Sequence, residues 1–150
     1  MDAVIVNARP PNFEQIAAVF PMAGNDGVLF AYGGDIYAPG GKVVPPALVA
    51  HENVHLERQR ALGPAPGSTT QWSGADSWWH KYLHDSEFRY QEELLAHVAE
   101  FKTLKTSRDR NFGARLLLST ALRLTAPLYN YLPPRTLAEA LKDLQREIAK

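Results

Sequence analysis

The sequence of 150 residues contains no cysteine. Disulfide bonds and zinc sites built on thiolates are therefore excluded, and any bound metal must be held by histidine, aspartate or glutamate. Acidic and basic side chains balance at 16 each, so the charge gives no indication of a nucleic acid or an acidic membrane surface as a partner. The absence of disulfides fits a cytoplasmic protein.

Long apolar runs are absent as well. The N-terminus carries Asp2 and lacks the apolar core of a signal peptide. The longest apolar-rich stretch, residues 116–124, is interrupted by Arg123 and falls short of the ~18 residues that span a bilayer. We therefore expect a cytoplasmic protein without a membrane segment. Residues 1–150 are enough for one domain with its own hydrophobic core.

Glycine and proline are frequent in residues 1–46, and helical patterns fill most of the remainder. In the first part, Asn12 and Pro21 predict the start and the stop of a short helix. Two β-branched and aromatic runs, residues 28–32 and 36–38, flank a Gly-Gly-Asp turn and predict a β-hairpin.

Five helices are predicted after this hairpin. The first begins at the proline pair 45–46, where a missing N–H costs nothing, and ends before Gly63. Residues 65–74 are expected to form a loop. The other four helices are expected to begin at Asp76 or Ser77, at Asp85 or Ser86, near Asp109 and near Thr136, and the last three to end near Thr106, Leu124 and Ile148. The sequence thus predicts a mostly helical α+β fold with a short hairpin or sheet.

The first of these helices carries a pattern with chemical meaning, His51-Glu52-Asn53-Val54-His55. A spacing of four residues puts both imidazoles on one helix face, about 5–6 Å apart at Cβ, so that both can bind one ion. Glu52 lies one residue further round the helix and can reach a water molecule on the metal without being a ligand. Such an HExxH pattern is typical of zinc hydrolases. We predict zinc ligands at His51 and His55, with Glu52 as catalytic base.

A catalytic zinc ion usually has three protein ligands and an open position for water. No histidine follows in the next turn, so the third ligand must come from farther along the chain. The candidates share one predicted helix: Glu92, Glu93, His97 and Glu100. Helical geometry leaves the choice open and mildly favours Glu92, which lies at the border of the apolar face, whereas Glu93 lies largely opposite that face.

At this point the sequence resembles the gluzincins, zinc peptidases in which HExxH is followed by a glutamate on a later helix. Residues 88–97 are similar to the ligand helix of that family, in which alanine follows the glutamate after three residues, as Ala96 follows Glu93. The short chain and the Trp-rich segment 78–83 resemble the minimal gluzincins and small phage-encoded HExxH proteins. The similarity covers about residues 28–100.

The resemblance implies a minimal zincin-like domain in which His51, His55 and Glu93 hold Zn²⁺ and Glu52 is the general base. His97 is a departure, because the family commonly has aspartate at this position. That substitution puts in doubt the supporting contact that the aspartate makes.

The resemblance also implies an edge strand above the active helix that binds the substrate backbone. Residues 28–32 or 36–38 would form this strand, and the alternative is that they only cover the core. On the ligand helix, Arg89, His97 and Glu100 are expected to orient the glutamate.

Several other residues have less specific signals. A phenol can stabilise an oxyanion, and the sequence does not choose among four candidates: Tyr82, Tyr90, Tyr129 and Tyr131. His80 and His84 are four residues apart but have no acid between them, so we expect a surface or packing role. The tryptophans, Trp72, Trp78 and Trp79, are expected to pack in the core or anchor loops.

These observations predict a zinc metallopeptidase that acts on a peptide or protein substrate. Two alternatives stay open. One is a zinc-binding protein without peptidase activity that serves as a structural or assembly component, for example of a phage particle. The other is a latent peptidase whose site is covered by residues 63–75 or by the C-terminus. The substrate preference and the oligomeric state are not predicted.

Overall fold

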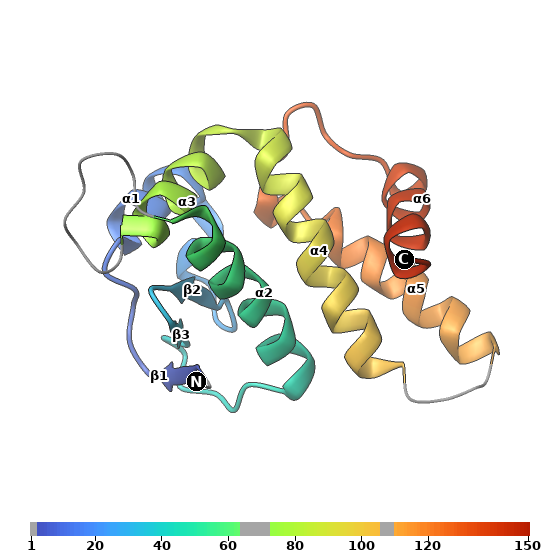
Figure 1. Ribbon diagram of the computed structural model, residues 1–150, viewed down its shortest axis with the longest axis horizontal. Helices are drawn as coiled ribbons and strands as arrows, with labels where there is room; N and C mark the ends of the chain where they lie inside the picture. The colour runs from blue at the N-terminus through green and yellow to red at the C-terminus, as the bar shows by residue number, and fades with distance from the viewer. Residues whose placement is uncertain (1–2, 64–72, 106–109) are drawn as a thin grey trace.

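The computed structural model of the protein describes residues 3–63, 73–105 and 110–150. These parts form six α-helices, two short 3-10 helices and one small three-stranded sheet (Figure 1). The predicted fold class, α+β and mostly helical, is confirmed.

In chain order the elements are β1 (Val4–Val6), α1 (Phe13–Val19), η1 (Pro21–Gly24), β2 (Phe30–Tyr32), β3 (Asp35–Tyr37), α2 (Pro46–Leu62), α3 (Ser73–His84), α4 (Ser86–Leu104), α5 (Arg110–Leu124), η2 (Pro127–Tyr129) and α6 (Leu137–Ile148). The bounds of α2 agree with the prediction because both ends have strong local signals. Pro46 occupies the first turn, and Gly63 ends the helix with a φ of 69°.

The predicted hairpin is present as β2 and β3, which pair antiparallel with Ala31 opposite Ile36. Gly33 and Gly34 supply the positive φ angles, 62° and 109°, that a tight two-residue turn requires. β1 was not predicted. It pairs parallel with β3 along the other edge, giving the strand order β1-β3-β2. A strand of three residues whose partner is distant in sequence has no local signal.

The prediction for the start of α3 was wrong. The helix begins at Ser73, before the predicted cap residues Asp76 and Ser77. A Cβ atom on Gly74 would lie 2.5 Å from the carbonyl oxygen of Gln59. Glycine therefore lets the first turn of α3 pack directly on α2, and this tertiary contact extends the helix upstream of its local cap signal.

The other helix starts agree with their predicted caps. Asp85 accepts a hydrogen bond from the backbone N–H of Phe88 and caps α4, and Thr136 forms a reciprocal capping box with Glu139 at α6. Asn12 precedes α1 as predicted, although its side chain makes no capping bond. The expectations for a loop from residue 65, for Trp72, for the end of a helix near Thr106 and for a start at Asp109 concern residues outside the described ranges.

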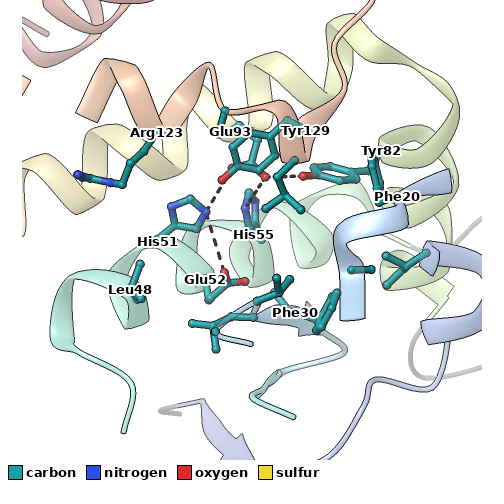
Figure 2. Close-up of a pocket in the computed structure, with 18 of the residues that line it drawn as sticks. Phe20, Phe30, Leu48, His51, Glu52, His55, Tyr82, Glu93, Arg123 and Tyr129 are labelled. Carbon is teal, nitrogen blue, oxygen red and sulfur yellow. Dashed lines mark hydrogen bonds and ion pairs between the residues drawn. The ribbon is translucent and has the colours of Figure 1, made fainter. Parts of the chain in front are cut away.

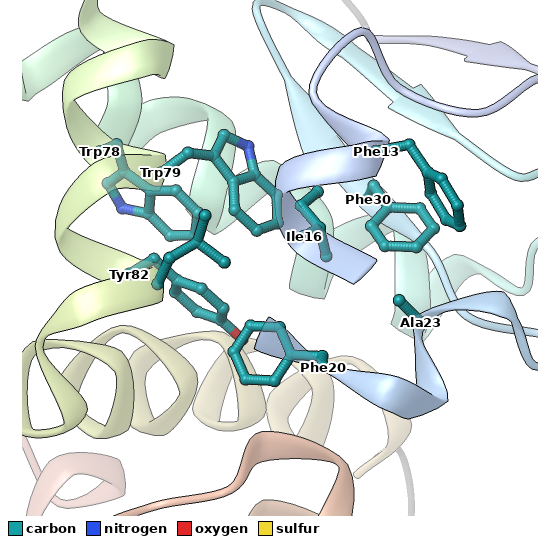
Figure 3. Packing of buried hydrophobic residues seen from close by; sticks show 9 residues of the cluster. Phe13, Ile16, Phe20, Ala23, Phe30, Trp78, Trp79 and Tyr82 are labelled. Carbon is teal, nitrogen blue, oxygen red and sulfur yellow. The ribbon is translucent and has the colours of Figure 1, made fainter. Parts of the chain in front are cut away.

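Two hydrophobic clusters lie on either side of the α2–α4 pair. The first joins the N-terminal segment to α3 (Figure 3), and its buried members are Phe13, Ile16, Phe20, Ala23, Phe30, Trp78, Trp79, Tyr82 and Leu83. The second joins α4, α5 and α6, and its buried members are Tyr90, Leu94, Val98, Ala121, Leu124, Tyr131, Ala140 and Leu144. Within the described ranges, no helix has the length and apolar content needed to cross a membrane.

The second cluster should contribute strongly to stability. Leu144 is fully buried in it, and the exposed Leu118 on α5 provides a matched control. We expect Leu144→Ala to lower the free energy of unfolding by about 2–5 kcal/mol, because it removes apolar contacts and leaves a cavity. Leu118→Ala should change it by about 0.5 kcal/mol or less. Urea denaturation of both variants tests this, and equal losses would show that the cluster is not packed as described.

Candidate metal centre

The helices α2 and α4 lie side by side (Figure 1). The contact between them buries many polar side chains. Its buried polar side chains are His51, Glu52, His55 and Gln59 from α2, and Glu92, Glu93, His97 and Glu100 from α4. Burying so many ionisable groups costs free energy unless each has a partner of opposite charge or a hydrogen bond. This interface therefore has to be explained by a site rather than by packing alone.

The three predicted metal ligands meet at the centre of this interface. The Nε2 atoms of His51 and His55 each lie 3.3 Å from a different carboxylate oxygen of Glu93. One ligand atom from each residue lies within 4.8 Å of the others, and all three residues are buried. Figure 2 shows the two imidazoles rising from α2 toward the carboxylate of Glu93. This group could hold a metal ion.

The donor set fits a small divalent cation. Atoms bound tetrahedrally at ~2.0–2.1 Å lie about 3.3–3.4 Å apart, which matches the nitrogen–oxygen distances found here. The Oε2 atom of Glu93 is buried and has no hydrogen-bond partner among the described residues. A cation between the carboxylate and the two imidazoles would satisfy this oxygen.

The electrostatics also call for positive charge at this point. Burial lowers the pKa of His51, but the neighbouring carboxylates of Glu100 and Glu93 outweigh burial and raise the pKa to about 10. Burial alone would raise the pKa of Glu93, yet the neighbouring His55 and His51 hold it well below its ordinary value. The carboxylate is therefore ionised, and it is balanced by a proton on the imidazoles or by a metal ion in place of that proton.

Glu52 lies beside the ligand group without belonging to it. Its Oε1 atom is 4.0 Å from Nε2 of His51, and its side chain faces the same space (Figure 2). Burial raises the pKa of this carboxyl, although the charges of His51 and His55 act in the opposite direction. A raised pKa makes a carboxylate a better proton acceptor near neutral pH.

A second carboxylate orients His51 from behind. Oε2 of Glu100 lies 3.2 Å from Nδ1 of His51 and accepts its hydrogen, which leaves Nε2 directed toward Glu93. The other oxygen of Glu100 pairs with Nη2 of Arg123 at 3.0 Å. His97 donates from Nδ1 to the backbone oxygen of Glu93 at 2.8 Å, and its ring packs edge-on against His51.

His51, His97 and Glu100 also have ligand atoms within 4.8 Å of one another in the described part of the chain. This group is the weaker candidate. It would use Nδ1 of His51, which already donates to Glu100, and the guanidinium of Arg123 would repel a cation there.

The choice between Glu92 and Glu93 follows from their partners. Glu92 is equally buried, but its carboxylate accepts from Arg58 at 2.8 Å and from the indole of Trp78 at 2.9 Å. Glu93 faces the histidines and accepts from the hydroxyl of Tyr82 at 2.6 Å. Helical geometry mildly favoured Glu92 as the residue that faces the histidines, but Glu93 faces them instead. This is possible because α4 is buried on both its apolar and its polar face.

The candidate ligands His51, His55 and Glu93 line a cavity of about 340 Å³. Its opposite wall is apolar and comes largely from the N-terminal segment: Ile16, Phe20, Ala23, Val28, Leu29, Phe30 and Ala31. Trp78 and Trp79 pack in the core as predicted and also line this cavity. His80 and His84 are exposed on α3, which agrees with the expected surface role.

Of the four candidate tyrosines, Tyr129 and Tyr82 line the cavity. Desolvation and the charge of Glu93 raise the pKa of Tyr129, so this phenol keeps its proton. Tyr82 donates to Glu93, and Tyr90 donates to Asp143. Tyr131 stacks on Tyr129 rather than lining the cavity.

Two residues of the site were not predicted. Arg123 had a weak signal, since it is the charge that interrupts the apolar stretch of α5. Gln59 follows His51 and His55 at the same spacing of four, so it shares their helix face, but only the structure shows what it contacts. The expectation that Arg89 orients Glu93 was wrong. Its guanidinium instead donates to the backbone oxygens of Tyr82, Tyr129 and Asn130.

The chain matches no known protein family, no curated protein and no solved structure.

The assignment of Glu93 as a ligand can be tested against Glu92 as its neighbour. Glu93→Ala should abolish tight binding of a divalent metal, because it removes one of three ligands. Glu92→Ala should retain the metal and lose stability instead, because it leaves the indole of Trp78 unpaired. Titration with Co²⁺, followed by its visible absorption, and thermal melting would separate the two effects. Binding by Glu93→Ala with the affinity of the unmodified protein would disprove the assignment.

Proposed function

We propose that the protein is a zinc metallopeptidase of the gluzincin type, with His51, His55 and Glu93 as ligands and Glu52 as general base. One observation carries this proposal. A buried carboxylate, Glu52, stands next to a two-histidine, one-glutamate group without joining it, and that group faces a cavity. Zinc is inferred from the nitrogen and oxygen ligands and the absence of cysteine.

An open coordination position distinguishes catalytic zinc from structural zinc. Structural sites are usually closed by four protein ligands, whereas catalytic sites have three and leave one position for water or substrate. The group of His51, His55 and Glu93 offers three ligand atoms, and the adjoining cavity of about 340 Å³ leaves room for a substrate. This supports a catalytic role over a purely structural one.

The residues around the cavity suggest a division of labour in peptide hydrolysis. A zinc ion at this site would polarise the scissile carbonyl and lower the pKa of water toward ~7. Glu52 accepts a proton as the water oxygen adds to the carbonyl carbon, and it delivers that proton to the amine when the C–N bond breaks. Tyr129 donates a hydrogen bond to the oxygen that gains charge. Glu100, held by Arg123, fixes the orientation of His51.

β2 is the strand best placed to hold a substrate backbone. It lies at one edge of the sheet, pairs with β3 on one side only, and contacts α2. Phe30 and Ala31 of this strand line the cavity, as do Val28 and Leu29 before it. An extended peptide can add to such an edge as a further strand. Of the two segments considered from the sequence, β2 and the residues before it therefore fit this part.

The first test is metal content. We expect one zinc ion per chain after purification without added metal, measured by elemental analysis. His51→Ala and His55→Ala should each lose the metal and melt at a lower temperature, because metal binding stabilises the folded state. Metal-free protein that takes up no zinc on dialysis would rule the proposal out.

The second test concerns Glu52. Glu52→Gln should keep the zinc and the fold while hydrolysis falls by roughly 10²–10⁴-fold, the usual contribution of general base catalysis. The measurement is cleavage of a peptide library with a chelator control. Loss of zinc from Glu52→Gln, comparable to His51→Ala, would make Glu52 a ligand and contradict its role as base.

The peptide-library assay also distinguishes a peptidase from a zinc-binding protein without peptidase activity. A protein that binds zinc with these ligands but cleaves no peptide would be a structural or assembly component with a zincin-like site. The other alternative is a latent peptidase whose site is covered by residues 63–75 or by the C-terminus. Most of residues 63–75 lie outside the described ranges. The C-terminal part forms one wall of the cavity through Ala126, Leu128 and Tyr129, and the cavity stays open beside it.

A further inference from the structure

The open edge of β2 is closed at one end by a side chain of α2. Gln59 is 3% exposed, and its amide donates to the backbone oxygen of Ala31 at 2.8 Å and accepts from the backbone N–H of Gly33 at 3.1 Å. A neighbouring parallel strand would make the same two bonds on either side of Tyr32. The indole of Trp79 donates to the same oxygen of Ala31 at 2.9 Å. The protein thus fills this stretch of the edge with its own side chains.

Just upstream of this block, the edge borders the cavity. The N–H and the carbonyl of one strand residue face the same edge, so the N–H of Ala31 faces the same edge as its oxygen, and Leu29 lies just before the strand. Both residues line the cavity. A bound peptide can therefore pair along residues 29–31 and has to end where Gln59 and Trp79 begin.

The distance from the metal ligands to this closed end is short. Gln59 follows His55 by one helical turn, a rise of about 6 Å. An extended chain advances about 3.3 Å per residue, so about two residues fit in this space. A long polypeptide could not continue past the block without leaving the strand edge.

The charges near the block indicate which chain end it receives. Beyond Ala31, Asp35 is the cross-strand neighbour of Tyr32, and Asp76 accepts a hydrogen bond from the Tyr32 hydroxyl at 2.6 Å. These carboxylates attract an α-ammonium group and repel a terminal carboxylate. The first carbonyl of an antiparallel peptide would accept a hydrogen bond from the N–H of Ala31. Its amino group would not have to donate to the oxygen of Ala31, which already accepts from Gln59 and Trp79.

We propose that this cleft binds peptides by their free N-terminus and releases one or about two residues from that end. The proposal rests on the proposed peptidase function and specifies its substrate class. The reaction is the same hydrolysis: water adds to the first or second carbonyl carbon, the following C–N bond breaks, and the shortened peptide leaves with a new amino terminus. Gln59 and Trp79 act as positioning residues that set where the substrate ends.

The test compares an alternating Leu–Ala peptide that has a free N-terminus with the same peptide acetylated. Zinc-loaded protein should release short N-terminal fragments from the free peptide, detected by mass spectrometry, and should cleave the acetylated one at least about tenfold more slowly. Calorimetric titration of both peptides into zinc-loaded Glu52→Gln should show a preference of about tenfold for the free form, equivalent to about 1.4 kcal/mol. Internal cleavage of both peptides, or equal affinities, would overturn the proposal.

The calorimetric binding measurement distinguishes failure of the N-terminal preference from failure of the peptidase function. Selective binding of the free N-terminus without any cleavage would support the binding mode inferred here, but it would contradict the peptidase function and with it the release of N-terminal residues. Cleavage at internal bonds would support the peptidase function and overturn this inference. Absence of both binding and cleavage would overturn both.

A variant pair tests the block itself. Gln59→Ala should narrow the preference for the free N-terminus by raising the affinity for the acetylated peptide, since it frees the N–H of Gly33 and one lone pair on Ala31. Gln145→Ala, an exposed position on α6, is the matched control and should leave the preference unchanged. An unchanged preference in a folded Gln59→Ala variant would overturn the role of Gln59. Should that variant fail to fold, the comparison of the two peptides on the unmodified protein decides.

Discussion

The carboxylate of Glu93, buried between the imidazoles of His51 and His55, is the constraint that orders the rest of the structure. Removing such a charge from water costs several kcal/mol unless strong partners replace the solvent. Each of the three carboxylates that α4 contributes to this interface therefore has its own partners. Glu92 is paired with Arg58 and Trp78, and Glu100 is paired with Arg123 and His51. Glu93 has Tyr82 and the two histidines, and its Oε2 atom has no hydrogen-bond partner among the described residues.

This constraint explains why the two hydrophobic clusters lie on opposite sides of the α2–α4 pair. The N-terminal cluster holds α3, which brings the hydroxyl of Tyr82 to Glu93 and also forms the apolar wall of the cavity. The C-terminal cluster holds α5, which brings Arg123 to Glu100. Arg89 binds the backbone oxygens of Tyr129 and Asn130 and so fixes the segment that follows α5 over the site. Each cluster thus stabilises the fold and also supplies groups to the polar interface.

The sequence predicted those features whose cause is local. The ends of α2 follow from Pro46 and Gly63, and the helical spacing of HExxH alone predicts that His51 and His55 share one face with Glu52 beside it. The rest depends on contacts between distant segments. Glu93, for example, is 2% exposed because α2 covers the polar face of α4. Gly74 begins α3 early because of a contact with Gln59, and β1 exists only through its pairing with β3. No pattern within one segment contains such information.

The charge that orients His51 comes from Glu100 and not from position 97 of the same helix. An imidazole at position 97 cannot supply the negative charge that accepts a hydrogen bond from Nδ1 of His51. Glu100 lies three residues later, about one turn further along the same face, and its carboxylate reaches that nitrogen at 3.2 Å. His97 is then free to bond the backbone of Glu93 and to pack edge-on against the His51 ring at 4.7 Å. Glu100 therefore supplies the carboxylate that orients His51, and the ion pair with Arg123 compensates for the burial of this carboxylate.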